Sequence, residues 1–242
     1  ATTTGAGAAG AGAGAAAFCA AGAGAACGAG AGTGAGAEAA GSGVEKLALT
    51  GGGAIYRYTA PDGQEIYLVA DERQEPVLHR EDVNFDGVED VVALTRLGAS
   101  NAFYDFFVWD GRQYVYATPP GQEAGLANYG LDADRGYVWT QANNGMAGLE
   151  CEYGVYRWQG TELAPVRVLR AETSSRWQDS PDGSYSFAIV YDNRILRATV
   201  TDYPDGVYEG RVIWEKEFEL EAEDFDGAEV WEEMRGALTA GL

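Results

Sequence analysis

Residues 106–116 read FFVWDGRQYVY, in which two aromatic and β-branched runs flank the dipeptide Asp110-Gly111. Aromatic and β-branched side chains favour strands, and Asp-Gly readily adopts the left-handed backbone that a tight turn between antiparallel strands requires. The stretch therefore predicts a β-hairpin. Strand-like runs also flank Asp62-Gly63 and Asp86-Gly87, which predicts the same element at both of those places.

These turn sequences recur at a nearly constant interval. Asp-Gly begins at positions 62, 86, 110, 182, 205 and 226, and the runs 134–136 (DRG) and 158–160 (WQG) fill the wide gap. The first five steps are 24 residues each, and the last two are 23 and 21. Two such units make about 48 residues, the length of one four-stranded propeller blade. We expect an all-β fold, a propeller-like array of β-hairpins; a β-sandwich is the alternative.

The end of the chain follows a helical period instead. Val230, Met234 and Leu238 fall on one stripe of a helix, with Trp231 beside it. Asp226 or Gly227 stands where an N-cap belongs. We therefore expect a short C-terminal helix.

The first 43 residues have a different composition from the rest. Of the first 40, 20 are Ala and 12 are Gly, and Phe18 is the only large apolar side chain. Such a segment buries too little apolar surface to offset its conformational entropy. We expect 1–43 to be a disordered low-complexity tether and 44–242 to form one β-rich domain. Lipidation of Cys27, after a partial lipoprotein cleavage box, is an alternative left open.

The charge of the chain excludes several classes of partner. It holds 16 Lys and Arg against 37 Asp and Glu, a net charge of −21. Binding to phosphate backbones or anionic membranes needs clustered basic residues, so we expect no nucleic acid partner. No apolar run approaches 18 residues, and no membrane-spanning helix is expected. Only Cys151 of the three cysteines lies in the β-rich part, where we expect a buried strand residue.

One acidic motif carries a specific chemistry. Residues 82–90 read DVNFDGVED, which matches the pattern D-x-N-x-D-G-x-x-D. Alternate positions place the side-chain oxygens of Asp82, Asn84 and Asp86 on one side of a tight loop. The Val88 carbonyl adds an oxygen, and Asp90 closes the shell directly or through water. Hard oxygen ligands in this order suit Ca²⁺.

The flanks of this motif differ from those of an EF-hand. The EF-hand's bidentate Glu would stand at Ala93, and the sequences on both sides are strand-like. We therefore expect a calcium loop between strands, completed by water or by a ligand from elsewhere. An acidic turn in an acidic protein is the simpler alternative. The acidic runs 132–134 and 224–227 lack the spacing and are expected to be a solvated turn and a helix start.

Enzyme motifs are weak. The nearest approach to G-x-S-x-G, at 98–102, ends in Ala102, and the one histidine, His79, lies three residues before the acidic loop. A Ser-His-Asp system would have to use that histidine. We expect His79 to have a hydrogen-bonding or surface role, and we expect no enzymatic activity.

From about residue 82 to 172 the chain resembles a family of bacterial extracytoplasmic proteins with a propeller-like β fold and a calcium loop. That family includes periplasmic immunity lipoproteins that inhibit lysozyme-like effectors of type IV secretion. The resemblance implies that Asp82, Asn84, Asp86 and Asp90 are metal ligands. The matching phrases lie at 82–92, 98–101, 104–109, 131–134 and 156–163.

Three functional classes follow. The first is an extracytoplasmic calcium-binding module, secreted, periplasmic or tethered to the cell surface, that binds a protein as a monomer. Its acidic surface suits a basic lysozyme-like cell-wall hydrolase, which it would inhibit. The second is a carbohydrate- or cell-wall-binding module that stacks sugars on its many aromatic side chains. The third, a glycoside hydrolase using a pair of carboxylates, has the least support.

Overall fold

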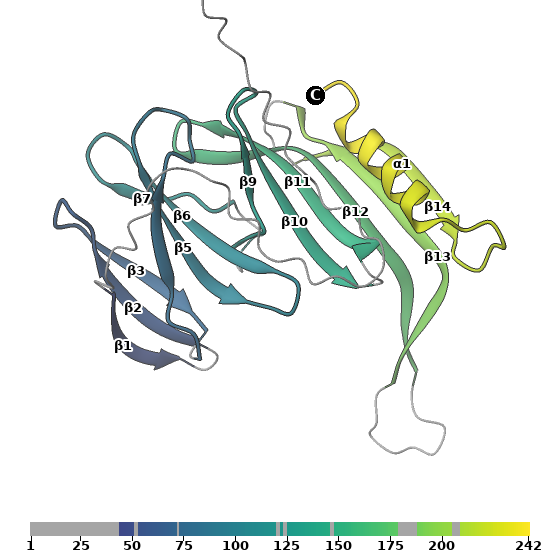
Figure 1. Ribbon diagram of the computed structural model, residues 1–242, viewed down its shortest axis with the longest axis horizontal. Coiled ribbons are helices and arrows are strands. Elements are labelled where there is room, and N and C mark those ends of the chain that lie inside the picture. The colour runs from purple at the N-terminus through teal and green to yellow at the C-terminus, as the bar shows by residue number, and fades with distance from the viewer. Residues whose placement is uncertain are drawn as a thin grey trace, which may run out of the picture.

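A computed structural model describes residues 44–242, apart from 51–52, 72, 120–121, 123–124, 146–147, 179–187 and 205–208. The expected Ala/Gly tether, 1–43, lies outside the described residues. The described part consists of antiparallel β-sheets and one C-terminal helix, which confirms the expected all-β class (Figure 1). The elements are β1 (Val44–Thr50), β2 (Gly53–Thr59), β3 (Glu65–Ala70), β4 (Val77–Glu81), β5 (Asp90–Leu97), β6 (Ala102–Trp109), β7 (Tyr114–Tyr116), β8 (Leu126–Ala127), β9 (Gly130–Asp132), β10 (Tyr137–Gly145), β11 (Glu150–Gln159), β12 (Glu162–Gln178), β13 (Ala188–Asp202), β14 (Arg211–Glu219) and α1 (Gly227–Thr239).

The strands form three sheets. A three-stranded sheet has the order β1-β2-β3, and a five-stranded sheet has the order β4-β5-β6-β7 with β8 also paired to β6. A six-stranded sheet runs β14-β13-β12-β11-β10-β9. Chain neighbours are thus sheet neighbours almost throughout, as expected for a chain of hairpins.

The predicted turns lie between the paired strands. Within the described residues, the turns at 62, 86, 110, 134 and 158 join β2 to β3, β4 to β5, β6 to β7, β9 to β10 and β11 to β12. Their glycines have positive φ angles, for example 93° at Gly111, which a side chain at that position would oppose. The turns at 182 and 205 lie outside the described residues, and the last one begins α1.

Three apolar clusters hold the sheets and the helix in successive layers. Phe107 of β6 packs with Leu68 in the cluster between the three- and five-stranded sheets. The next residue along the strand, Phe106, packs with Tyr156 between the five- and six-stranded sheets. Successive side chains of a strand point to opposite faces, so β6 contributes to both clusters. On its far face the six-stranded sheet packs against α1 through Met234.

The arrangement differs from the expected propeller in the number of strands per sheet and in closure. The hairpins recur as the turn spacing predicts, and the sheets stack face to face, as propeller blades do (Figure 1). The sheets have three, five and six strands rather than four each, and the described residues form no closed ring. Within the described residues, the element that packs on the outer face of the six-stranded sheet is the helix α1 rather than a further sheet.

The terminal helix agrees with its sequence pattern. Its buried side chains are Val230, Met234 and Leu238, and the N-cap is Asp226, whose carboxylate accepts a hydrogen bond from the amide of Ala228 at 2.8 Å. Such a cap satisfies one of the amides that the first helical turn leaves without a partner. No helix in the described part of the chain is long and apolar enough to cross a bilayer.

Candidate metal centre

The acidic loop connects β4 to β5 at one end of the five-stranded sheet. Its backbone turns sharply, with φ angles of +62° at Phe85 and +86° at Gly87. Glycine adopts such an angle at no steric cost, whereas a phenylalanine does so only where the surrounding contacts hold it. The loop is therefore held in one conformation by its own hydrogen bonds.

Those hydrogen bonds gather the predicted ligands on one side of the turn. The amide of Asp86 donates to Asp82 Oδ1 and to Asn84 Oδ1, both at 3.1 Å. The amide of Gly87 donates to the second oxygen of Asp82 at 2.9 Å. Two successive backbone amides thus draw oxygens from the first and third motif positions into one place.

The fifth position completes this group. Asp86 Oδ1 accepts from the amide of Val88 at 2.8 Å, and its Oδ2 accepts from Asn84 Nδ2 at 3.0 Å. Asp82 and Asn84 are half-buried, while Asp86 is exposed, so the group is open to solvent on one side. The loop thus brings Asp82, Asn84 and Asp86 together as the sequence predicts.

Asp90 has a different environment from the other acidic positions. It is fully buried, and its two oxygens accept from the amides of Val83 at 3.1 Å and Trp109 at 2.8 Å. Burial is the main cause that raises the pKa of Asp90 to about 6, and the two amide bonds oppose that rise. Asp90 therefore ties the start of the loop to its end and to β6.

Two further residues attach the loop to its surroundings, and the sequence predicts neither contact. Trp158 of β11 donates from Nε1 to the Val83 carbonyl at 2.6 Å, across the interface with the six-stranded sheet. Arg80 donates from Nη2 to the Glu89 carbonyl at 2.7 Å and lies over the Tyr114 ring. Trp158 is 75 residues away in the chain, so no local pattern could reveal its contact.

The donor set fits a hard cation. Two carboxylates and an amide oxygen converge, and each carboxylate has about four lone-pair sites, so an oxygen that accepts one amide retains capacity for a metal. Within the described residues no three His, Cys, Asp or Glu side chains form a metal-binding group by themselves. A complete shell here would accordingly include oxygens of other kinds, such as Asn84 Oδ1 and the Val88 carbonyl, and water.

The other residues that the sequence singled out are buried or take part in hydrogen bonds within the fold. His79 Nε2 lies 3.0 Å from Tyr129 Oη, which itself donates to Glu81; this agrees with the expected hydrogen-bonding role. The hydrogen bond with His79 is the largest cause that lowers the pKa of Glu81. Cys151 is buried in β11, and burial raises the pKa of its thiol to about 12. Asp132 accepts from the Arg135 amide in the turn before β10.

Comparison with known proteins adds little to this geometry. No protein-family profile matches the chain, and no curated protein sequence matches it. A solved structure described as that of a Xanthomonas type IV secretion system related protein resembles it with 14% sequence identity and a TM-score of 0.40. The match covers 71% of this chain and 90% of the other. The family named above stays a prediction.

Proposed function

We propose that this chain is an extracytoplasmic calcium-binding module that acts by binding another protein. The observation that carries the metal assignment is the convergence of Asp82, Asn84 and Asp86 on two successive amides of one turn. The loop already has the turn that the metal requires, so binding costs little reordering of the backbone.

The metal would relieve an electrostatic cost that the loop has in its absence. Asp82, Asp86, Glu89 and Asp90 lie within nine residues, and the charges of Asp86 and Asp82 both help to raise the pKa of Asp90. Carboxylates held this close oppose one another's ionisation. A divalent cation bound by Asp82, Asn84, Asp86 and the Val88 carbonyl offsets that repulsion. Asp90 ties the start of the loop to its end and to β6.

The affinity expected of such a loop agrees with a site outside the cytoplasm. Extracellular calcium modules bind with dissociation constants of about 10⁻⁴–10⁻³ M. A loop that lacks the bidentate Glu of an EF-hand belongs at this weak end. It would fill at the calcium concentration outside the cell and stay largely empty in the cytosol.

Binding rather than catalysis is supported by the state of the candidate catalytic groups. The thiol of Cys151 is buried and its raised pKa keeps it protonated, so it is not a nucleophile at neutral pH. His79 is engaged with Tyr129. The net charge of −21 favours a basic partner, and a lysozyme-like cell-wall hydrolase is the class that we propose.

Calorimetry with Ca²⁺ tests the metal assignment. We expect one binding event per chain in the native protein and none in Asp86→Ala. Asp224→Ala is the matched control, because Asp224 belongs to the similar run 224–227 that begins α1, and this variant should bind like the native protein. Undiminished heat in Asp86→Ala would refute the assignment, as would equal losses in both variants.

A turbidity assay tests the partner class separately. Peptidoglycan is mixed with a basic lysozyme-like muramidase, and clearing is followed with and without an excess of the chain. We expect the chain to slow clearing in calcium-containing buffer. Full clearing at micromolar chain would exclude inhibition of that muramidase while leaving the metal assignment intact.

A further inference from the structure

The end of β10 holds the one Asn-Gly pair in the sequence. Asparagine occurs at positions 84, 101, 128, 143, 144 and 193, and only Asn144 is followed by glycine. In such a pair the main-chain nitrogen of the glycine can attack the side-chain amide carbon of the asparagine, because the glycine has no Cβ to obstruct the approach. Asn144 is therefore chemically different from the other five asparagines.

Asn144 is also the residue of β10 that the sheet holds least firmly. The register of β10 against β11 pairs Asn143 with Cys151 and Gly145 with Glu150, so Asn144 is the extra residue of a β-bulge. Its side chain is exposed to solvent. A regular strand pairing keeps the backbone extended, with the attacking nitrogen away from the side-chain carbon, whereas the extra residue of a bulge has no partner across the ladder. The reacting groups are therefore accessible and free to approach each other.

The glycine at position 145 is required by its cross-strand neighbour. A Cβ built on Gly145 would lie 2.3 Å from Glu150 Oε2, closer than a Cβ approaches any atom. The carboxylate of Glu150 is held in that place, because its Oε1 accepts hydrogen bonds from the amide and the hydroxyl of Thr173. The fold thus keeps, directly after Asn144, the residue type that makes an asparagine reactive.

We propose that Asn144 is a site of spontaneous deamidation in the folded chain. The Gly145 nitrogen bonds to Asn144 Cγ, the bond from Cγ to the side-chain nitrogen breaks, and a five-membered succinimide forms. The proton of the Gly145 amide passes through solvent to the departing ammonia. Water then opens the ring at either carbonyl and leaves aspartate or isoaspartate at position 144, so one water is consumed for each ammonia released. The inference goes beyond the proposed function and is independent of calcium.

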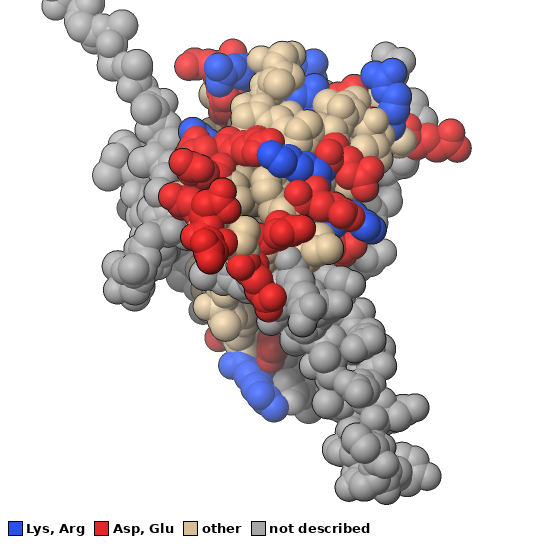
Figure 2. All heavy atoms as spheres, turned by 90° about the vertical axis from the view of Figure 1, so that its right-hand side faces the viewer, with Lys and Arg blue, Asp and Glu red and all other residues tan. Residues whose placement is uncertain are grey.

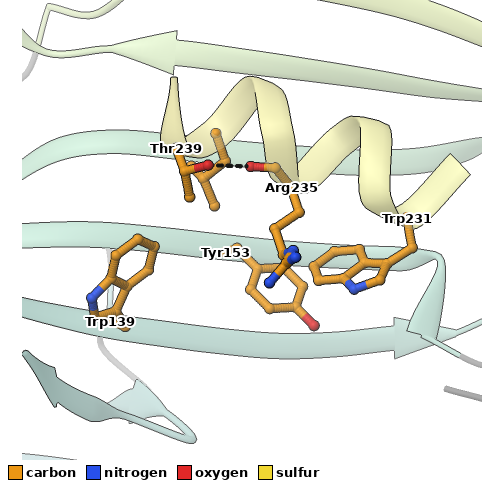
Figure 3. Close-up of a pocket in the computed structure, with 6 residues that line it drawn as sticks. Trp139, Tyr153, Trp231, Arg235 and Thr239 are labelled. Atoms are coloured by element: carbon orange, nitrogen blue, oxygen red, sulfur yellow. Dashed lines mark hydrogen bonds between the residues drawn. The ribbon is translucent and has the colours of Figure 1, made fainter. Parts of the chain in front are cut away.

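Isoaspartate at this position lengthens the main chain by one carbon beside a contact between two sheets. The side chain of Asn101, in the turn between β5 and β6, accepts from the Asn143 amide at 2.8 Å and donates to the Asn143 carbonyl at 2.9 Å. It thus pairs with β10 as a neighbouring strand would. Sliding of the hairpin to absorb the extra carbon is opposed by Tyr153 of β11, whose ring centroid lies 4.6 Å from that of Trp231 beneath α1 (Figure 3). The two bonds to Asn101 are therefore the ones expected to break.

Deamidation also adds a negative charge to an acidic region. Residues 215–235 contain ten Asp and Glu, all exposed, and Figure 2 shows acidic side chains gathered on the side of the molecule that holds α1. The end of the β10–β11 hairpin lies near the start of α1, since a Cβ on Gly227 would lie 3.6 Å from Leu149 Cδ1. Repulsion between exposed charges is largely screened beyond about 8 Å at physiological salt. We therefore expect the longer backbone, rather than the charge, to weaken the fold.

Peptide mapping of the incubated protein tests the modification. The native full-length chain is kept at physiological temperature in mildly alkaline buffer and digested with trypsin, and the peptide 136–157 is analysed by mass spectrometry with electron-transfer fragmentation, which distinguishes aspartate from isoaspartate. We expect Asn144 to convert at least about tenfold faster than Asn143 in the same peptide, because the residue after Asn143 has a Cβ. Asn144→Gln should stay unconverted, since glutamine would have to form a less favourable six-membered ring.

Thermal unfolding separates the effect of the backbone from that of the charge. The converted chain should lose about 4–8 °C of its thermal midpoint through the loss of the two hydrogen bonds to Asn101. Asn144→Gln, incubated in parallel, is the matched control for changes at every other position and should keep its midpoint. Freshly prepared Asn144→Asp has the added charge without the added main-chain carbon, and it should also unfold like the native chain.

Several results would overturn the proposal. An intact Asn144 in the native chain, with conversion only in urea, would mean that the strand protects it despite the bulge. Equal conversion of Asn143 and Asn144 would remove the role of the glycine. An unchanged midpoint after conversion would show that the contact between Asn101 and Asn143 does not depend on the neighbouring residue, and an equal loss in fresh Asn144→Asp would assign the effect to charge.

Discussion

Replacing Arg167 by methionine should loosen the terminal helix from the sheet. Arg167 lies on β12 with its side chain 9% exposed, and it donates from Nη1 to the carbonyls of Leu238 at 3.0 Å and Ala240 at 2.7 Å. It also donates from Nε and Nη2 to Asp202 Oδ1 at 3.3 and 3.1 Å. The helix has no basic residue in its own last turn, so Arg167 supplies the charge that suits its C-terminal end.

The magnitude follows from what the substitution leaves behind. Arg167→Met keeps most of the apolar stem but leaves two helix carbonyls and one carboxylate without their donor. Breaking a buried ion pair on one side costs about 3–5 kcal/mol. The Asp202 side chain is 24% exposed and regains some water, so we expect the low end, about 3 kcal/mol. For a domain of about 200 residues this lowers the thermal midpoint by about 6–12 °C.

Urea and thermal unfolding measure the loss, and hydrogen exchange shows where it falls. Protection should decrease first in the last two turns of α1. Arg197→Met is the matched control: Arg197 pairs with Glu217 but is 60% exposed, so its loss should leave the stability almost unchanged. If the two variants lost the same stability, or if protection of α1 were unchanged in Arg167→Met, Arg167 would not anchor the helix.

Three further outcomes are expected. If Ca²⁺ is present at a hundredfold excess over Kd, removing it with a chelator should lower the thermal midpoint by about 5–10 °C. Hydrogen-exchange protection should fall in β5 and β6 before it falls in α1. A thermal midpoint and an exchange pattern that do not change with chelator would contradict the site. Cys151, with its thiol pKa raised to about 12, should react with a disulfide reagent only on unfolding, as peptide mapping would show; rapid labelling of the native chain would contradict its burial. Burial is the main cause that raises the pKa of Asp105 above the ordinary aspartate value of 3.8. The folded protein therefore keeps a proton on Asp105 that the unfolded chain releases, so the free energy of unfolding should fall as the pH rises above 3.8. Asp105→Asn should flatten that part of a stability–pH curve measured in urea, and an unchanged slope would assign it to other groups.

Local sequence was sufficient for the turns, the terminal helix and the contents of the acidic loop. Asp-Gly at 62 and 110 specifies a reversal within four residues, whatever the rest of the chain does. The stripe of Val230, Met234 and Leu238 selects the buried face of α1 because a helix repeats every 3.6 residues. In the same way, alternate positions of one tight loop bring Asp82, Asn84 and Asp86 together through amides only a few residues away.

The role of Asp90 shows where this local reasoning ends. Spacing alone assigns it to the metal shell with the other acidic positions. Its partners are the amide of Val83, inside the loop, and the amide of Trp109, which is 19 residues later in the chain and belongs to the neighbouring strand β6. The register of β5 against β6 places Trp109 there, and a nine-residue motif carries no information about that register.

The sequence by itself determined the all-β class, the hairpin spacing, the capped terminal helix and the residues of the acidic loop, because each depends on contacts between near neighbours in the chain. Only the tertiary structure decided that the sheets have three, five and six strands, that they stack without closing a ring, and that Arg167 holds a helix end 71 residues away. Such features depend on which apolar faces are buried against each other, and many pairings of similar strands satisfy the same alternating pattern until the whole chain is packed.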